Sequence, residues 1–171
     1  MRPVVSAVFR STLETPVGPL QVSVDGDGTV VEILLPNRSH VAAPPEPLPR
    51  SAACGMDAAR QQLSEYFRRE RRAFDLPLQP AGSPFERRVW TRLLAVPYGV
   101  TISYGAIAEE LGLINGARAV GRANGANPIP IVIPCHRVIG SGGELTGYGG
   151  GLPLKRALLE LEGADSRLPL F

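Results

Sequence analysis

The sequence predicts an α+β fold made of a small N-terminal α/β domain, residues 1–80, and a mostly helical C-terminal domain, residues 81–171. Three observations lead to this prediction. Short β-branched segments separated by turn residues fill the first third of the chain, one amphipathic segment follows them, and helix-capping residues recur in the second half. With 171 residues, the chain can bury a sufficient core without a disulfide or a metal ion.

Three short strands are expected at the start of the N-terminal domain. They are predicted at Val4–Phe9, Leu20–Val24 and Val30–Leu35, where β-branched residues are frequent. Asp25-Gly26-Asp27-Gly28 separates the second strand from the third, and Asp-Gly pairs favour the tight turn of a β-hairpin. These two strands are therefore expected to pair antiparallel.

A loop and one helix complete the predicted N-terminal domain. The stretch from Pro36 to Pro49 is rich in proline, which interrupts helices and strands, so we expect a loop. From Asp57 to Arg71, apolar residues recur at helical spacing while arginines and glutamines occupy the opposite face. Leu76–Gly82 contains two prolines and a glycine and is expected to link the two domains.

The first helix of the C-terminal domain has a clear start signal. Ser83 is a suitable N-cap, Pro84 fits the first helical position, and Glu86 can complete a capping box. The helix is expected to stop near Val96-Pro97-Tyr98-Gly99.

Two shorter helices are expected next. The first is capped by Ser103 and terminated by Gly112, and the second spans Ala117–Asn124 and is terminated by Gly125. Short helices joined by a tight glycine-containing turn are typical of a helix-turn-helix, which binds DNA. Such pairs also occur as plain core structure, so the pattern alone leaves both interpretations open.

Composition favours a globular protein, because 44% of the residues are hydrophobic and 20% are charged. No apolar run is long enough to cross a bilayer, and the N-terminus lacks a signal-peptide pattern, so we expect a cytoplasmic protein without membrane contact. Cys54 and Cys135 are expected to stay reduced, and they form no zinc-binding spacing with His40 and His136. We expect no metal and no cofactor.

Positive charge is concentrated in the second half of the chain. Residues 1–80 contain nine basic and nine acidic residues, whereas residues 87–156 contain eight basic and three acidic ones. This distribution suits a nucleic-acid-binding face, although a solvated surface with a modest positive bias would have the same composition.

The stretch Pro134-Cys135-His136-Arg137-Val138 is the most informative for chemistry. A lone buried cysteine is usually an inert apolar residue, but a thiol whose proton is taken by a base becomes a nucleophile. Side chains adjacent in sequence diverge, so proton transfer from Cys135 to His136 would need an intermediary such as a water molecule.

Seven motifs of the second half resemble the methylated-DNA-protein-cysteine methyltransferases, also called O6-alkylguanine-DNA alkyltransferases. In chain order they are Arg88-Val89-Trp90, Val96-Pro97-Tyr98-Gly99, Thr101-Ile102-Ser103-Tyr104, Arg118-Ala119-Val120-Gly121, Ala123-Asn124-Gly125-Ala126-Asn127-Pro128, Pro134-Cys135-His136-Arg137-Val138 and Leu145-Thr146-Gly147-Tyr148-Gly149-Gly150-Gly151-Leu152. The first half resembles the family only in its size and in its order of strands and helix.

The resemblance implies DNA repair by irreversible transfer of a methyl or larger alkyl group from O6 of guanine to the protein's own cysteine. Cys135 would be the acceptor, His136 its base through a water molecule, and Glu162 the carboxylate that orients His136. Asn127 would brace this network and tie the second helix of the helix-turn-helix to the cysteine segment. Whether O4-alkylthymine is also repaired stays open.

The resemblance also implies a pocket for the damaged base, which must leave the base stack before it can meet a cysteine. Tyr104 would donate a hydrogen bond to the flipped base and crowd the target phosphate. Backbone groups near Val138 and Gly149 would read the edge of the base. Tyr148 and Trp90 are also expected to bind the substrate.

The expected partner is double-stranded DNA that contains O6-alkylguanine. Arg118 would fill the space that the flipped nucleotide vacates, while small residues let its helix approach the minor groove closely. The expected DNA-contacting residues are Arg118, Ala119, Gly121, Arg122, Ala123, Asn124 and Tyr104. We expect a monomer, and the sequence does not decide whether copies cluster on DNA.

Two rival functions fit parts of the sequence. A helix-turn-helix regulator without chemistry would explain the basic second half, but it would leave the motif around Cys135 unexplained. A cysteine hydrolase would use the same thiol, but it also needs an oxyanion hole and a substrate carbonyl.

Overall fold

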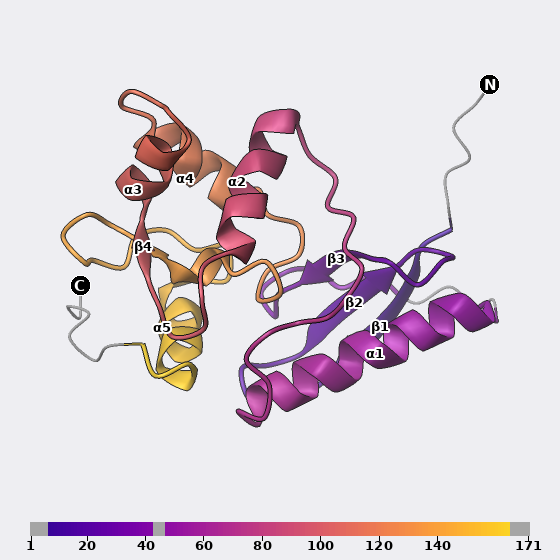
Figure 1. Cartoon of the computed structure of the whole chain (residues 1–171). Helices are drawn as coiled ribbons and strands as arrows, with labels where there is room; N and C mark the ends of the chain where they lie inside the picture. The colour runs from indigo at the N-terminus through magenta and orange to yellow at the C-terminus, as the bar shows by residue number, and fades with distance from the viewer. Residues whose placement is uncertain (1–6, 43–46, 165–171) are drawn as a thin grey trace, which may run out of the picture. The chain divides into compact units, whose positions relative to one another are not determined.

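The computed structural model describes residues 7–42 and 47–164 and divides into two compact units, Met1–Ala81 and Gly82–Phe171 (Figure 1). The predicted α+β class is confirmed, since the first unit contains a small antiparallel sheet and the second is mostly helical. Over the described residues, no helix is both long and apolar enough to cross a membrane.

The first unit is a three-stranded antiparallel sheet with one helix packed along it (Figure 1). Strands β1 (Phe9–Leu13), β2 (Leu20–Val24) and β3 (Val30–Leu34) lie in that order, and every residue of the central strand is buried. The predicted hairpin joins β2 to β3. The Asp25 carboxylate stabilises its turn by accepting hydrogen bonds from the backbone N–H groups of Asp27 and Thr29, at 3.0 and 2.9 Å.

The predicted first strand is in the wrong place. The structure puts β1 at Phe9–Leu13 instead of Val4–Phe9, and residues 4–6 lie outside the described residues. The segment Phe-Arg-Ser-Thr-Leu has apolar side chains only at its two ends, so its composition gives little strand signal. Its position is set by pairing with β2, in a register that places Phe9 opposite Val24 and Leu13 opposite Leu20.

The predicted bounds of the first helix are also wrong. Helix α1 spans Arg50–Phe67, whereas the sequence suggested 57–71. Its start contains Gly55, which packs directly on the backbone of Gly28, where an added Cβ would clash. Ala52 and Met56 in this first part are buried as well, so the apolar face of the helix extends further toward the N-terminus than the sequence suggested. The helix ends early because Arg69 has a φ of 61°, outside the helical range.

The second unit contains four α-helices among its described residues: α2 (Pro84–Leu94), α3 (Tyr104–Glu110), α4 (Ala117–Gly125) and α5 (Leu152–Leu161). Helix α2 has the predicted capping box, because Ser83 Oγ accepts from Glu86 N at 3.2 Å and Glu86 Oε2 accepts from Ser83 N at 2.7 Å. Ser83 therefore fixes where the unit's first helix begins. Helix α4 packs against both α2 and α3.

A short parallel strand pair brings two distant segments of this unit together. Strand β4 (Ile102–Ser103) pairs with β5 (Val138–Ile139), and Ile102 lies opposite Val138. Strand β4 leads directly into α3, while β5 directly follows the 3-10 turn η1 (Cys135–Arg137). The pairing thus holds the start of α3, with Tyr104, beside the turn that carries the cysteine.

Candidate active site

Cys135 lies at the start of η1, at the end of a buried and strained apolar segment. Ile131 in this segment has a φ of 74°, a conformation that costs a β-branched residue on the order of 1–3 kcal/mol. Asn127 braces the segment, because its Nδ2 donates to Ile133 O at 2.8 Å and its Oδ1 accepts from Ile129 N at 3.0 Å. The backbone that delivers Cys135 is therefore fixed before any substrate arrives.

Cys135 is buried, with 4% of the residue exposed. Burial raises the pKa of this thiol, and hydrogen bonds from the Asn127 and Tyr148 side chains, together with the positive charge of Lys155, act to lower that pKa. The resting group is therefore a thiol. A base must take its proton, and the surrounding donors stabilise the thiolate once it forms.

His136, the residue after Cys135, forms a buried pair with Glu162. His136 Nε2 lies 2.7 Å from Glu162 Oε1, and neither side chain is exposed. Burial lowers the pKa of His136 although the Glu162 carboxylate acts to raise it, so the imidazole is neutral near pH 7. An ionised carboxylate can only accept, so Nε2 carries the ring proton. Among the described residues nothing bonds to Nδ1, which is left able to accept a proton.

Arg137 holds Glu162 from the other side. Its Nε donates to Glu162 Oε2 and its second terminal nitrogen to Oε1, both at 2.9 Å, while its first terminal nitrogen donates to Val96 O at 2.6 Å. Gly99 N also donates to Glu162 Oε2, at 3.2 Å. Burial alone would raise the pKa of Glu162, but the hydrogen bonds from His136 and Arg137 lower it to about 2.

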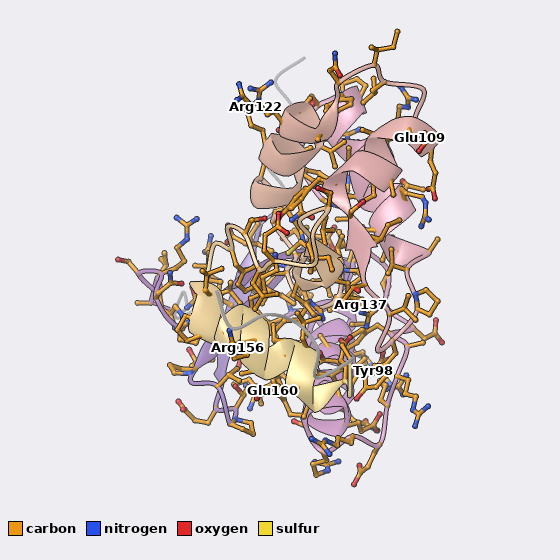
Figure 2. All side chains as sticks on the ribbon, turned by 90° about the vertical axis from the view of Figure 1, so that its left-hand side faces the viewer. Tyr98, Glu109, Arg122, Arg137, Arg156 and Glu160 are labelled. Atoms are coloured by element: carbon orange, nitrogen blue, oxygen red, sulfur yellow. The ribbon has the colours of Figure 1, made fainter. Side chains whose placement is uncertain are left out.

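These contacts place the carboxylate at the junction of three segments. Glu162 is the C-cap of α5, Arg137 ends η1, and Val96 and Gly99 belong to the loop after α2. Figure 2 shows Arg137 and Tyr98 beside the C-terminal end of α5, where Tyr98 Oη donates to Leu161 O at 3.2 Å. The same groups that orient His136 therefore also hold the unit together.

Four of the five predicted base-binding residues lie near the cysteine turn or in the glycine-rich segment, and the fifth, Trp90, does not. Tyr104 is half-buried, and its hydroxyl donates to Thr146 O at 3.4 Å; Tyr148 is likewise half-buried beside the thiol, and Gly149 is exposed. Val138 is fully buried in β5, so only its backbone could contact a base. Tyr104 and Tyr148 thus lie near the Cys135 thiol, Val138 directly follows the cysteine turn, and Gly149 belongs to the glycine-rich segment.

The structure places Trp90 in the core, not in a pocket. Its side chain is 1% exposed, and its Nε1 donates to Ala123 O at 2.8 Å. Trp90 therefore ties α2 to α4. An indole with a buried hydrogen-bond partner of this kind is a structural anchor.

The predicted DNA-contacting residues of α4 do not all face outward. Arg118 and Arg122 are exposed, and Ala119 and Gly121 are partly exposed, with Gly121 next to the Tyr104 ring. Figure 2 shows Arg122 on α4 and Glu109 on α3 extending in opposite directions. Ala123 and Asn124, in contrast, are buried at 2% and 4% exposure.

Asn124, which we expected to contact DNA, adds a second link between α4 and the cysteine turn. Its Nδ2 donates to Cys135 O at 3.2 Å, which ties α4 to the cysteine turn. Asn127, just after α4, braces the segment before the cysteine, as expected, and contacts the thiol itself. The two asparagines are three positions apart, and the sequence gives no sign of which one faces the turn.

Sequence reasoning assigned no role to Arg137 or Lys155, both of which the structure buries beside the reactive groups. The sequence signal for Arg137 was its place in the motif around Cys135. Lys155 could have been found by counting, because it is the only lysine in the chain. No group of three or more His, Cys, Asp or Glu side chains that could hold a metal ion exists among the described residues.

The ionised Glu162 should contribute stability that depends on pH. Because its pKa is about 2 when folded and 4.5 ordinarily, the contribution is complete above 4.5 and is lost as the pH falls toward 2. Glu162→Gln should therefore lower the free energy of unfolding by about 3 kcal/mol at pH 7, and by progressively less below pH 4.5. Chemical denaturation at several pH values measures both quantities.

The matched control is Glu160→Gln, which removes an exposed carboxylate from the same helix. It should change the unfolding free energy by less than about 0.5 kcal/mol. A Glu162→Gln deficit that stays constant from pH 7 to pH 3 would contradict the assigned ionisation.

Several known proteins resemble this chain over most of its length. The family model "6-O-methylguanine DNA methyltransferase, DNA binding domain" matches residues 84–164. The methylated-DNA–protein-cysteine methyltransferase of Mycobacterium tuberculosis is 48% identical over 169 residues, 95% of each chain, and that of Methanosarcina acetivorans is 39% identical over 92% of this chain and 99% of its own. The crystal structure of M. tuberculosis OGT in complex with DNA superposes with a TM-score of 0.79 at 46% identity, covering 89% of this chain and 91% of that one. With relatives this similar over nearly its whole length, the chain belongs to the methylated-DNA–protein-cysteine methyltransferase family.

Proposed function

We propose that this protein repairs DNA by moving an alkyl group from O6 of guanine to Sγ of Cys135, once per molecule. Membership of the family supplies the reaction, transfer from methylated DNA to a protein cysteine. One observation supports the assignment to particular residues. His136 directly follows Cys135, and its Nε2 lies 2.7 Å from Glu162 Oε1 in a buried pair. Neither a regulator without chemistry nor a purely structural helix pair needs this arrangement.

The transfer begins with loss of the thiol proton. His136 accepts this proton at Nδ1 through one water molecule, and the resulting imidazolium is stabilised by the Glu162 carboxylate. Arg137 keeps Glu162 ionised and fixes its orientation. The thiolate is formed in a water-poor site, where it is a stronger nucleophile than in bulk water.

The sulfur then attacks the alkyl carbon from the side opposite to O6. The new S–C bond forms as the C–O6 bond breaks, and the electron pair leaves with guanine, which takes up a proton. Tyr104 is the donor we assign to the departing base, because its hydroxyl lies at the edge of the glycine-rich segment beside the thiol. The product is a thioether, which has no ionisable proton and does not hydrolyse readily in water, so the protein is consumed.

The DNA-binding face is assigned to the exposed side of α4. Arg118 and Arg122 supply positive charge, and the small residues Ala119 and Gly121 permit close approach to the DNA backbone. Ala123 and Asn124 are left out of this face because they are buried. Double-stranded DNA containing O6-alkylguanine is the substrate we propose for a monomer acting in the cytoplasm.

The acceptor assignment is tested with a duplex that carries labelled O6-methylguanine. After incubation and proteolysis, the label should be found on the peptide that contains Cys135, and it should plateau at one group per protein molecule. Cys135→Ser should abolish transfer while leaving binding to the duplex intact. Cys54→Ser is the matched control and should react fully, because Cys54 is an exposed residue of α1. Label on Cys54, or continued repair beyond one group per molecule, would refute the proposal.

The role of Arg118 is tested by comparing two substrates. A base in duplex DNA must be flipped out, whereas free O6-benzylguanine needs no flipping, so the second substrate serves as an internal control. Arg118→Ala should slow transfer from the duplex by about tenfold or more, and transfer from the free base by less than about twofold. Equal losses on both substrates would place Arg118 outside the flipping step.

A further inference from the structure

Asn124 is a buried polar residue between the DNA-binding face and the cysteine turn. It lies near the C-terminal end of α4, and only 4% of the residue is exposed. A buried amide is costly unless it is hydrogen-bonded, and an apolar side chain of similar size would fill the same space without that cost. The transfer reaction as described uses none of its atoms, so its contacts are the place to look for a task.

The amide of Asn124 acts through its nitrogen. Its Nδ2 donates one hydrogen to Cys135 O at 3.2 Å, whereas no group in residues 7–42 or 47–164 bonds to its Oδ1. Reversing the amide would set Oδ1 against the Cys135 carbonyl, and two acceptors cannot bond to each other. The second hydrogen of Nδ2 is therefore available for another acceptor.

That acceptor is the hydroxyl of Tyr104. Helices α3 and α4 pack together, and a Cβ built on Gly121, three positions before Asn124, would lie 3.8 Å from the Tyr104 ring (Figure 1). The ring therefore lies along the face of α4 that carries Asn124. Burial raises the pKa of Tyr104, and hydrogen bonds with the Thr146 and Asn124 side chains act to lower it. Because Oδ1 has no partner, Nδ2 makes the bond to Tyr104.

The direction of this hydrogen bond decides what the Tyr104 hydroxyl can do. A hydroxyl can rotate to donate or to accept, as the Thr146 hydroxyl also can, but an amide nitrogen only donates. With Nδ2–H directed at Oη, the hydroxyl proton must point away from Asn124, and it is given to Thr146 O at 3.4 Å. A bond of this length is weak, so the proton is readily transferred to a better-placed acceptor.

We propose that Asn124 is a positioning residue of the transfer reaction: its amide holds the Tyr104 hydroxyl with the proton directed toward the departing guanine, and joins that hydroxyl to the cysteine turn. This inference rests on the proposed function. No atom of Asn124 is transferred, because it acts through Tyr104. The helix that contacts DNA thereby also orients the donor that assists release of the base.

A double-mutant cycle tests the coupling between the two residues. Single-turnover transfer from free O6-benzylguanine is measured for the original protein, Asn124→Leu, Tyr104→Phe and the double variant. Asn124→Leu alone should slow transfer by about tenfold or more, because the hydroxyl proton is no longer directed. In Tyr104→Phe, which has no hydroxyl, the same substitution should slow transfer by less than about twofold.

Equal fold losses in both backgrounds would show a role of Asn124 that is independent of the hydroxyl, as a purely structural contact would be, and would overturn the proposal. If the original protein moves no label to Cys135, the proposed function itself fails. If it does, and the two losses simply multiply, the inference about Asn124 alone fails.

Asn124→Asp reverses the polarity of the side chain at nearly constant shape. A carboxylate only accepts, so it would draw the Tyr104 proton away from the base, and transfer should be at least as slow as in Asn124→Leu. The matched control is Asn115→Asp, which makes the same change at an exposed position of the turn between α3 and α4 and should react at the original rate. An Asn124→Asp variant as fast as this control would contradict the proposal.

An NMR measurement covers the case in which no Asn124 variant folds. In protein labelled with nitrogen-15 asparagine, the two Nδ2 hydrogens of Asn124 give separate signals, one for the bond to Cys135 O and one for the bond to Tyr104. Tyr104→Phe removes only the second acceptor, so one signal should move toward the position of an unbonded amide hydrogen while the other stays in place. If neither signal moves, Asn124 does not bond to the hydroxyl and the proposal is overturned.

Discussion

The buried carboxylate of Glu162 is the interaction on which the second unit depends. It accepts hydrogen bonds from His136, Arg137 and the backbone of Gly99, and thereby joins the end of α5 to the cysteine turn and to the loop after α2. A buried carboxylate is costly unless it is paired and fully hydrogen-bonded. Arg137 meets that requirement, which leaves His136 free to remain neutral. One ion pair therefore supports both the fold and the base.

Several separate contacts fix the turn that carries the reactive thiol. The β4–β5 pair brings Tyr104 to the cysteine turn, Asn124 binds the Cys135 carbonyl, and Asn127 fixes the strained segment that precedes it. Because these groups are ordered during folding, little conformational entropy is lost at the site when the base enters. Burial raises the pKa of the thiol, so the resting protein holds an unreactive thiol until His136 takes its proton.

The sequence allowed prediction of features whose determinants are local. The capping box at Ser83, the hairpin at Asp25 and the acceptor motif each occupy a few consecutive residues. Features set by long-range packing were missed or misplaced: β1 depends on its partner strand, the start of α1 on a contact with Gly28, and the burial of Trp90 on α4. The partners of Glu162 come from η1 and from the loop after α2, both distant in sequence from α5, so the roles of Arg137 and Gly99 had no local signal. The helix-turn-helix function of α3 and α4 stays a prediction.

The central claim is that His136 is a neutral base whose Nε2–H faces Glu162 and whose Nδ1 can accept the thiol proton. Nitrogen-15 NMR of histidine-labelled protein measures this directly, because the chain contains only His40 and His136 and a His40→Gln variant assigns the signals. At pH 7 the His136 ring should show one tautomer, with the proton on Nε2 and Nδ1 bare, and it should resist protonation to a pH below the ordinary value for histidine. A ring that is protonated at both nitrogens at pH 7, or one that carries its single proton on Nδ1, would contradict the claim.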